Sequence, residues 1–224
     1  FVFSLFALAA IRNIPKVENK NSKPSVGSII EGIQYAKARP ELVGTYLVDI
    51  IAMIFAMPMA LFPAMASSFG GATAAGWLYS GMAIGSVTLS FLSGWAHRIK
   101  RHGAAVIIAA TIWGLSIVGL GFAQSLVFAV VCLALAGVAD GVSGLYRSTI
   151  WNETIPSKLR GRLAGIEMLS YMTGPLLGNV RAGYVASISS NQISILSGGI
   201  LCVLGTLLCI VFLPKFWHYR STTK

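Results

Sequence analysis

The sequence predicts an all-α protein that crosses a membrane several times. Hydrophobic residues make up 55% of its 224 residues and charged residues only 11%, whereas a soluble domain usually carries about 25% charged residues. The apolar residues gather in six long segments, and the polar connections between these segments divide by charge. Together these observations indicate that lipid, in place of water, surrounds much of the surface.

Each of the six apolar segments has close to the ~20 residues that a helix needs to span a bilayer. They are residues 42–66, 74–95, 104–123, 126–150, 163–188 and 193–213. Glycines spaced four residues apart favour close helix contacts, and they occur at Gly81/Gly85, Gly137/Gly141 and Gly174/Gly178. Proline bends a helix, so we expect bends at Pro58, at Pro63 and at the Gly174-Pro175 step.

Four parts follow one another along the chain. Residues 1–11 form an apolar stretch about half a bilayer core in length, and we interpret it as the end of a truncated transmembrane helix. Residues 12–40 form a basic central loop with a short amphipathic helix, which should stop before Pro40 because the residue preceding a proline disfavours helix. Residues 41–214 form the six-helix bundle, and residues 215–224 form a polar C-terminal tail.

The positive charges predict the orientation. Of the 17 lysine and arginine residues, only Arg181 lies outside the segments 12–39, 98–101, 147–162 and 215–224. The connections on the other side, SSFGGAT, AQS and SSNQ, carry no charge. The positive-inside rule then places the basic loops and the C-terminus in the cytoplasm of a multi-pass cell-membrane protein. Anionic headgroups account for the formal net charge of +10, so no nucleic-acid partner is needed.

Charged residues within the apolar segments are the candidate functional residues, because charge at membrane depth is costly and commonly functional. Asp140 and Arg147 share one face of their helix at an i, i+7 spacing, and Ser143 lies between them. We expect the acid and the base to be coupled through Ser143 or a water. The alternative is that the pair only fixes helix packing.

Two further faces carry polar or adaptable side chains. Asp49 shares a face with Met53 and Met57, and it is either a protonatable group in a central cavity or a partner in a helix–helix hydrogen bond. The methionines are either an adaptable binding wall or plain packing. Glu167 and Arg181 lie two heptads apart on one face of the segment 163–188. We place these five residues, together with Asp140, Ser143 and Arg147, on a substrate or proton pathway.

The loops show a resemblance to a known family. Gly85, Gly94, Arg98 and Arg101 are spaced as in the signature loop of the major facilitator superfamily, although Arg98 stands where that loop usually has an acid. Pro156, Arg160, Gly161 and Arg162 resemble a loop of its drug and siderophore exporter branch. The whole chain, with six spans after a basic loop, looks like the C-terminal half of such a transporter.

The resemblance implies a fold and a mechanism. The six helices would form two inverted repeats of three, and this half would face a missing N-terminal six-helix half across a central cavity. The protein would export a small molecule, a drug or siderophore, by alternating access coupled to protons. Asp49 and Asp140 would be the candidate proton carriers, and the glycine and arginine residues of the two loops would gate the cavity.

Other classes of protein remain as alternatives. A membrane enzyme is disfavoured because no His/Asp/Glu cluster or nucleophile–base pair lies at membrane depth. We expect no cofactor and no metal, because Cys132, Cys202 and Cys209 sit singly in apolar runs typical of packing residues. The remaining alternative is a stand-alone six-helix channel or a structural membrane subunit.

Overall fold

The computed structural model describes residues 26–92, 94 and 99–221. The predicted truncated helix at 1–11, the first part of the basic loop and Arg98 lie outside the described residues. In chain order the described elements are α2 (Val26–Lys37), α3 (Pro40–Ala56), η1 (Met59–Leu61), α4 (Phe62–Phe69), α5 (Ala72–Leu92), α6 (His102–Gly121), α7 (Leu126–Thr154), α8 (Ser157–Ile188), α9 (Asn191–Phe212) and α10 (Pro214–Trp217). The part of the chain that the structure describes contains no strand, so the all-α fold class is confirmed.

The long helices match the predicted spans in position. Within the described residues, four helical segments are long and apolar enough to cross a membrane: Pro40–Phe69, His102–Gly121, Leu126–Thr154 and Asn191–Phe212. Helices α5 and α8, of 21 and 32 residues, are not among these four. Five charged residues interrupt the apolar sequence of α8, namely Lys158, Arg160, Arg162, Glu167 and Arg181.

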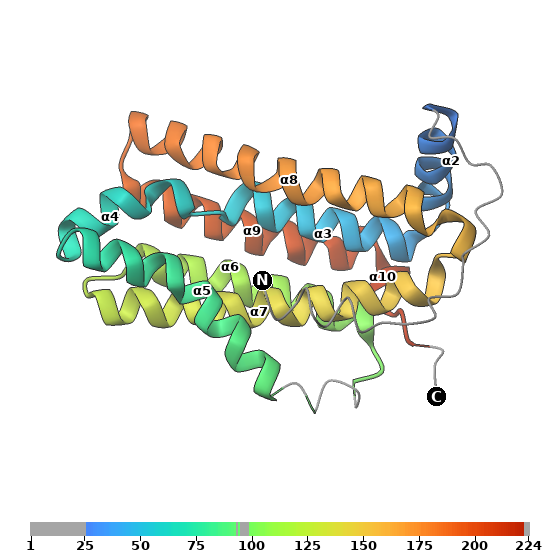
Figure 1. The fold of residues 1–224 in the computed structure, drawn as a ribbon, viewed down its shortest axis with the longest axis horizontal. Coiled ribbons are helices and arrows are strands. Elements are labelled where there is room, and N and C mark those ends of the chain that lie inside the picture. Colours follow the sequence, from blue (N-terminus) through green and yellow to red (C-terminus); the bar gives the residue numbers. More distant parts are fainter. Residues whose placement is uncertain (1–25, 93, 95–98, 222–224) are drawn as a thin grey trace, which may run out of the picture.

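The long helices form two layers, with α3, α8 and α9 in one and α5, α6 and α7 in the other (Figure 1). Helix α3 packs mainly against α8 and α9, and α7 packs mainly against α5 and α6. The predicted repeats are α3, α5 and α6 in one and α7, α8 and α9 in the other. The first helix of each repeat therefore packs against the second and third helices of the other repeat. This reciprocal exchange is what two inverted repeats of three helices would produce.

A break at Pro58 divides the first span. Helix α3 ends at Ala56, Met57 is extended with φ −90° and ψ 109°, and the short η1 helix leads into α4 with Pro63 in its first turn. The bend predicted at Pro58 is thus a full interruption of the helix. Helix α8, by contrast, runs through Pro175 without interruption.

Glycines bring neighbouring helices close together, as predicted. A β-carbon added at Gly85 would overlap the carbonyl oxygen of Ala134, and one at Gly137 would overlap that of Met82, so α5 and α7 approach at backbone distance. A β-carbon at Gly178 would overlap the carbonyl oxygen of Met53, which joins α8 to α3 in the same way. Small residues permit such contacts between membrane helices.

Helix α2 confirms the helix predicted in the basic loop, and it ends before Pro40. It is attached to the bundle end that carries the basic loops. Arg162 of α8 forms an ion pair with Glu31, and the Tyr35 hydroxyl donates a hydrogen bond of 2.7 Å to the Thr154 carbonyl. Whether α2 also lies on a membrane surface remains a prediction.

The C-terminal segment packs against the same end of the bundle. Phe216 is fully buried, and β-carbons at Gly44 or Gly103 would collide with its ring or backbone. The Tyr219 hydroxyl donates to Glu153 at 2.8 Å, and Ser221 donates to the same carboxylate. Burial and then this hydrogen bond raise the pKa of Tyr219.

Candidate functional site

An ion pair joins the two layers near the bundle end that carries the basic loops. Arg147 on α7 pairs with Asp49 on α3, and their side chains are only 9% and 6% exposed. Helices α3 and α7 otherwise make few direct contacts. Because these are the first helices of the two predicted repeats, the pair links one repeat to the other.

Further polar side chains surround Arg147. Asp140 is half-buried and lies two turns before Arg147 on the same helix. Asp140 and Glu167 of α8 both interact electrostatically with Arg147 and with Asp49. The Arg147 guanidinium carbon lies 5.7 Å from the ring centre of Tyr171, within range of a cation–π contact. Three helices thus contribute to one group, which we call the Arg147 cluster: Asp49, Asp140, Arg147, Glu167 and Tyr171.

The Arg147 cluster has more acids than bases. Asp49 pairs directly with the guanidinium, Asp140 and Glu167 interact with it electrostatically, and the Arg147 Nε is buried without a hydrogen-bond partner within the described residues. A buried carboxylate without a compensating cation is costly in free energy. The arrangement therefore favours uptake of protons or of a cation, and it leaves the arginine able to change its acidic partner.

The direct partner of Arg147 is not the residue that sequence spacing indicated, and coupling of Asp140 to Arg147 through Ser143 or a water remains a prediction. Sequence spacing indicated Asp140, bridged by Ser143, but the ion pair that the described residues contain is with Asp49. Ser143 is buried, 6% exposed, on the same helix. Two turns of helix separate Asp140 from Arg147, whereas close packing of α3 brings Asp49 directly to the guanidinium. Asp49 therefore links two helices through an ion pair, and its role as a protonatable group remains a prediction.

Arg181 has a different environment from the one expected on a substrate pathway. Its Nη1 donates to the Phe55 carbonyl at 2.9 Å and to the Ser194 carbonyl at 3.2 Å, and its Nη2 donates to the Ser197 hydroxyl at 2.7 Å. Phe55 lies in the last turn of α3, where the break at Pro58 removes intrahelical partners from the carbonyls. Arg181 therefore braces the broken helix.

Of the remaining pathway residues, Met53 and Met57 pack against α8, and Glu167 belongs to the Arg147 cluster. Met53 is 8% exposed and lies against Gly174 and Gly178 of α8, while Met57 is partly buried beside Gly178. This placement supports packing over an adaptable binding wall. The shared face of α8 is as predicted, because Glu167, Gly174 and Arg181 all approach α3.

Apart from Gly85, which lies within α5 against α7, the predicted gating residues that the structure describes lie at one end of the bundle. Pro156 precedes the first turn of α8, and Arg160 donates a hydrogen bond of 3.3 Å to the Asn152 carbonyl. Arg162 holds α2, Gly161 and Gly94 are exposed, and Arg101 is exposed at the start of α6. Nothing in these contacts tests a gating role, which remains a prediction.

Sequence reasoning missed two features of the site. Tyr171 follows Glu167 by one helical turn, so the i, i+4 spacing on α8 was the available signal. Asn179 accepts a hydrogen bond of 2.9 Å from the Ala60 backbone N–H, which completes the brace of the broken segment, and nothing in its spacing indicated this. The described residues contain no group of three or more His, Cys, Asp or Glu side chains that could hold a metal ion.

The fold and the cluster together define a class of protein: a helical, polytopic membrane protein with charged residues buried between its repeats. A family model described as "Major Facilitator Superfamily" matches residues 2–223. The chain therefore belongs to this superfamily.

Curated relatives point to one branch of the superfamily. Enterobactin exporter EntS of Escherichia coli (strain K12) is 26% identical over 222 residues, covering 98% of this chain and 53% of the relative. The protein of the same name from Shigella dysenteriae serotype 1 (strain Sd197) gives the same values. The chain spans about half the length of these relatives. No solved structure matches the chain.

Proposed function

We propose that this chain acts as the C-terminal half of a proton-coupled exporter of a small molecule, and that the Arg147 cluster couples proton movement to the change of conformation. The observation that carries the proposal is the buried ion pair of Arg147 with Asp49, on which two further carboxyl groups, Asp140 and Glu167, act electrostatically. The similarity to exporters named for enterobactin makes a siderophore the first substrate to test. The rest of the exporter would be an N-terminal six-helix half.

The mechanism follows from the charge balance. While Asp49 is ionised, its pair with Arg147 ties α3 to α7 across the two repeats. Protonation of Asp49 removes that attraction and frees the guanidinium for Asp140 or Glu167. The two first helices can then move relative to each other, which is the motion that alternating access requires. Substrate in the central cavity would compete for the same groups.

The orientation is part of the proposal. The positive-inside rule assigns the end with α2 and the α7–α8 connection to the cytoplasm. Ser157 and Ser68 lie at opposite ends of the bundle and are exposed, while the three native cysteines are buried. Single cysteines at Ser157 and Ser68 should therefore react with an impermeant reagent from inside and outside, respectively. Reaction of the Ser157 position from outside in intact cells would reverse the orientation.

The direct test is transport by the complete gene product in proteoliposomes. An imposed pH gradient should drive transport of enterobactin, and Asp49→Asn and Asp140→Asn should each weaken its dependence on the gradient. Glu41→Gln is the matched control, because Glu41 lies outside the cluster in a partly exposed pair with Arg39. Transport that is independent of the gradient in the unaltered protein would reject proton coupling, and absence of siderophore transport would reject that substrate.

A further inference from the structure

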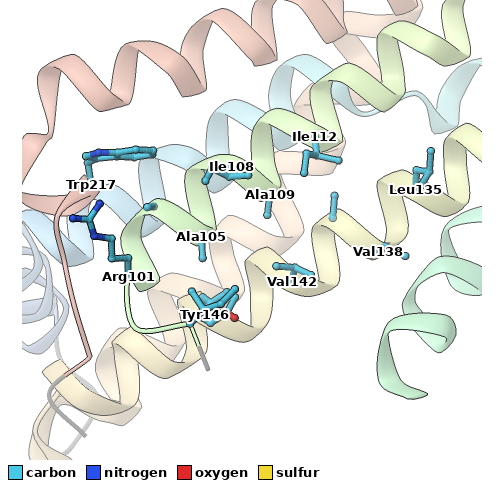
Figure 2. A pocket seen from close by; sticks show the side chains of 13 residues that line it. Arg101, Ala105, Ile108, Ala109, Ile112, Leu135, Val138, Val142, Tyr146 and Trp217 are labelled. Atoms are coloured by element: carbon cyan, nitrogen blue, oxygen red, sulfur yellow. The ribbon is translucent and has the colours of Figure 1, made fainter. Parts of the chain in front are cut away.

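A long apolar groove lies on the outer side of the bundle between α6 and α7. Its volume is about 620 Å³, within the ~300–1,000 Å³ range of ligand pockets. Small residues of α6 and α7 form its floor, among them Ala105, Ala109 and Val142, and its rim is formed by Ile108, Ile112 and Leu135, each about half exposed (Figure 2).

The two ends of the groove differ in chemistry. Arg101 and Trp217 stand together at the end nearest the basic loops, with Tyr146 beside them, whereas the opposite end is wholly aliphatic (Figure 2). Arg101 is exposed and forms no ion pair with any described residue. Tryptophan is enriched where a membrane protein meets the headgroup layer, and arginine binds phosphate with paired hydrogen bonds.

The length of the groove matches one leaflet of a bilayer. From Arg101 to Ile112 the rise along α6 is ~16 Å at 1.5 Å per residue. Half of a ~30 Å hydrocarbon core is ~15 Å. The groove is therefore long enough to hold one acyl chain from the headgroup layer to the bilayer midplane.

We infer that this groove binds an anionic phospholipid, with one acyl chain between α6 and α7 and the headgroup phosphate on Arg101. The geometry distinguishes this site from ordinary lipid contact on the rest of the bundle. The apolar groove leads to Trp217 and Arg101 at one end, so the apolar surface, the interfacial aromatic ring and the cation follow one another in the order that a phospholipid requires. Because α6 and α7 belong to different repeats, the lipid would bridge them.

Helix α5 leaves the groove uncovered. Its C-terminal end points away from the other helices (Figure 1), and Phe91 near that end is 84% exposed. Leu89 of α5 still lies against α7 beside Gly141. An acyl chain bound between α6 and α7 would therefore contact the surrounding lipid or α5 only on the side that faces away from the groove.

The test is native mass spectrometry of the complete gene product, delipidated and then titrated with dioleoyl phosphatidylglycerol or dioleoyl phosphatidylcholine. The two lipids have the same chains, so they separate the headgroup from the groove. The unaltered protein should retain one phosphatidylglycerol more tightly than phosphatidylcholine. Arg101→Gln should weaken phosphatidylglycerol roughly fivefold, as expected for one cation near an anionic headgroup, and leave phosphatidylcholine unchanged.

Two further variants complete the test. Lys158→Gln removes an exposed cation elsewhere on the same end of the bundle and should leave the binding of both lipids unchanged. Ala105→Phe fills the groove and should weaken both lipids. Equal retention of the two lipids by the unaltered protein, undiminished phosphatidylglycerol binding in Arg101→Gln, or undiminished binding in Ala105→Phe would each overturn the inference.

Discussion

Arg147 and Arg181 both lie within the helical bundle, but their surroundings differ in a way that separates coupling from architecture. Arg147 faces ionisable groups, namely Asp49, Asp140 and Glu167, which can each gain or lose a proton. Arg181 faces backbone carbonyls and a serine hydroxyl, none of which titrates. Charge at membrane depth is therefore not a sufficient sign of a transport site, and the chemistry of the partner decides its role.

The largest effect is expected from removing Arg147. Arg147→Gln leaves Asp49 buried without a cation, and breaking a buried pair typically costs about 3–5 kcal/mol. Protonation of Asp49 removes the unpaired charge, so the loss of stability should be greatest at high pH and shrink as the pH falls. Thermal unfolding of the purified protein across a pH series measures this.

A matched control exists for this variant. Arg160→Gln removes the same charge from an exposed side chain that donates a hydrogen bond to the Asn152 carbonyl, so its stability should change little at any pH. If Arg147→Gln loses the same stability at every pH, Asp49 is not the group left unpaired.

A smaller and pH-independent loss is expected at Arg181. Arg181→Gln leaves the carbonyls of Phe55 and Ser194 short of a donor, and an unsatisfied buried polar group costs about 1–3 kcal/mol. Because carbonyl groups do not titrate, the same pH series should show a constant difference from the unaltered protein. Arg181→Lys should recover only part of the loss, because a single ammonium lacks the planar fork of arginine. A loss that varies with pH would show that Arg181 faces a titrating group.

The smallest effect is expected at Asn179, the second element of the brace. Asn179→Ala removes the acceptor of the Ala60 N–H, and one hydrogen bond contributes about 1 kcal/mol. Asn179→Asp, which keeps an acceptor oxygen in place, should preserve more stability than alanine. Equal stability of the alanine variant and the unaltered protein would remove Asn179 from the brace.

Sequence patterns predicted what depends on one helix at a time. Apolar length located the six long helices, the proline at 58 located the break, and glycine spacing located the contacts of Gly85 with α7 and Gly178 with α3. The shared face of Glu167 and Arg181 was also correct. Each of these features follows from local steric or periodic rules that can be applied to the sequence of a single helix.

Partners across helices could not be predicted in the same way. Arg147 was assigned to Asp140 because both lie on one helix face, but Asp49 is 98 positions earlier in the chain and reaches Arg147 only through the packing of α3. Arg181 was assigned to the pathway by its charge, whereas its role depends on carbonyls that the break in α3 exposes. Both sets of contacts arise only from the tertiary arrangement.

The most direct test of the coupling role of Arg147 is a double-mutant cycle on efflux rate with Asp49→Asn and Arg147→Gln, corrected for protein abundance in the membrane. Each single variant should impair pH-driven efflux, and the double variant should recover part of it, because neither charge is then left unpaired. The parallel cycle with Asp140→Asn and Arg147→Gln should show a weaker interaction. Strictly additive losses for Asp49 and Arg147 would contradict the account, because the two residues would then act independently.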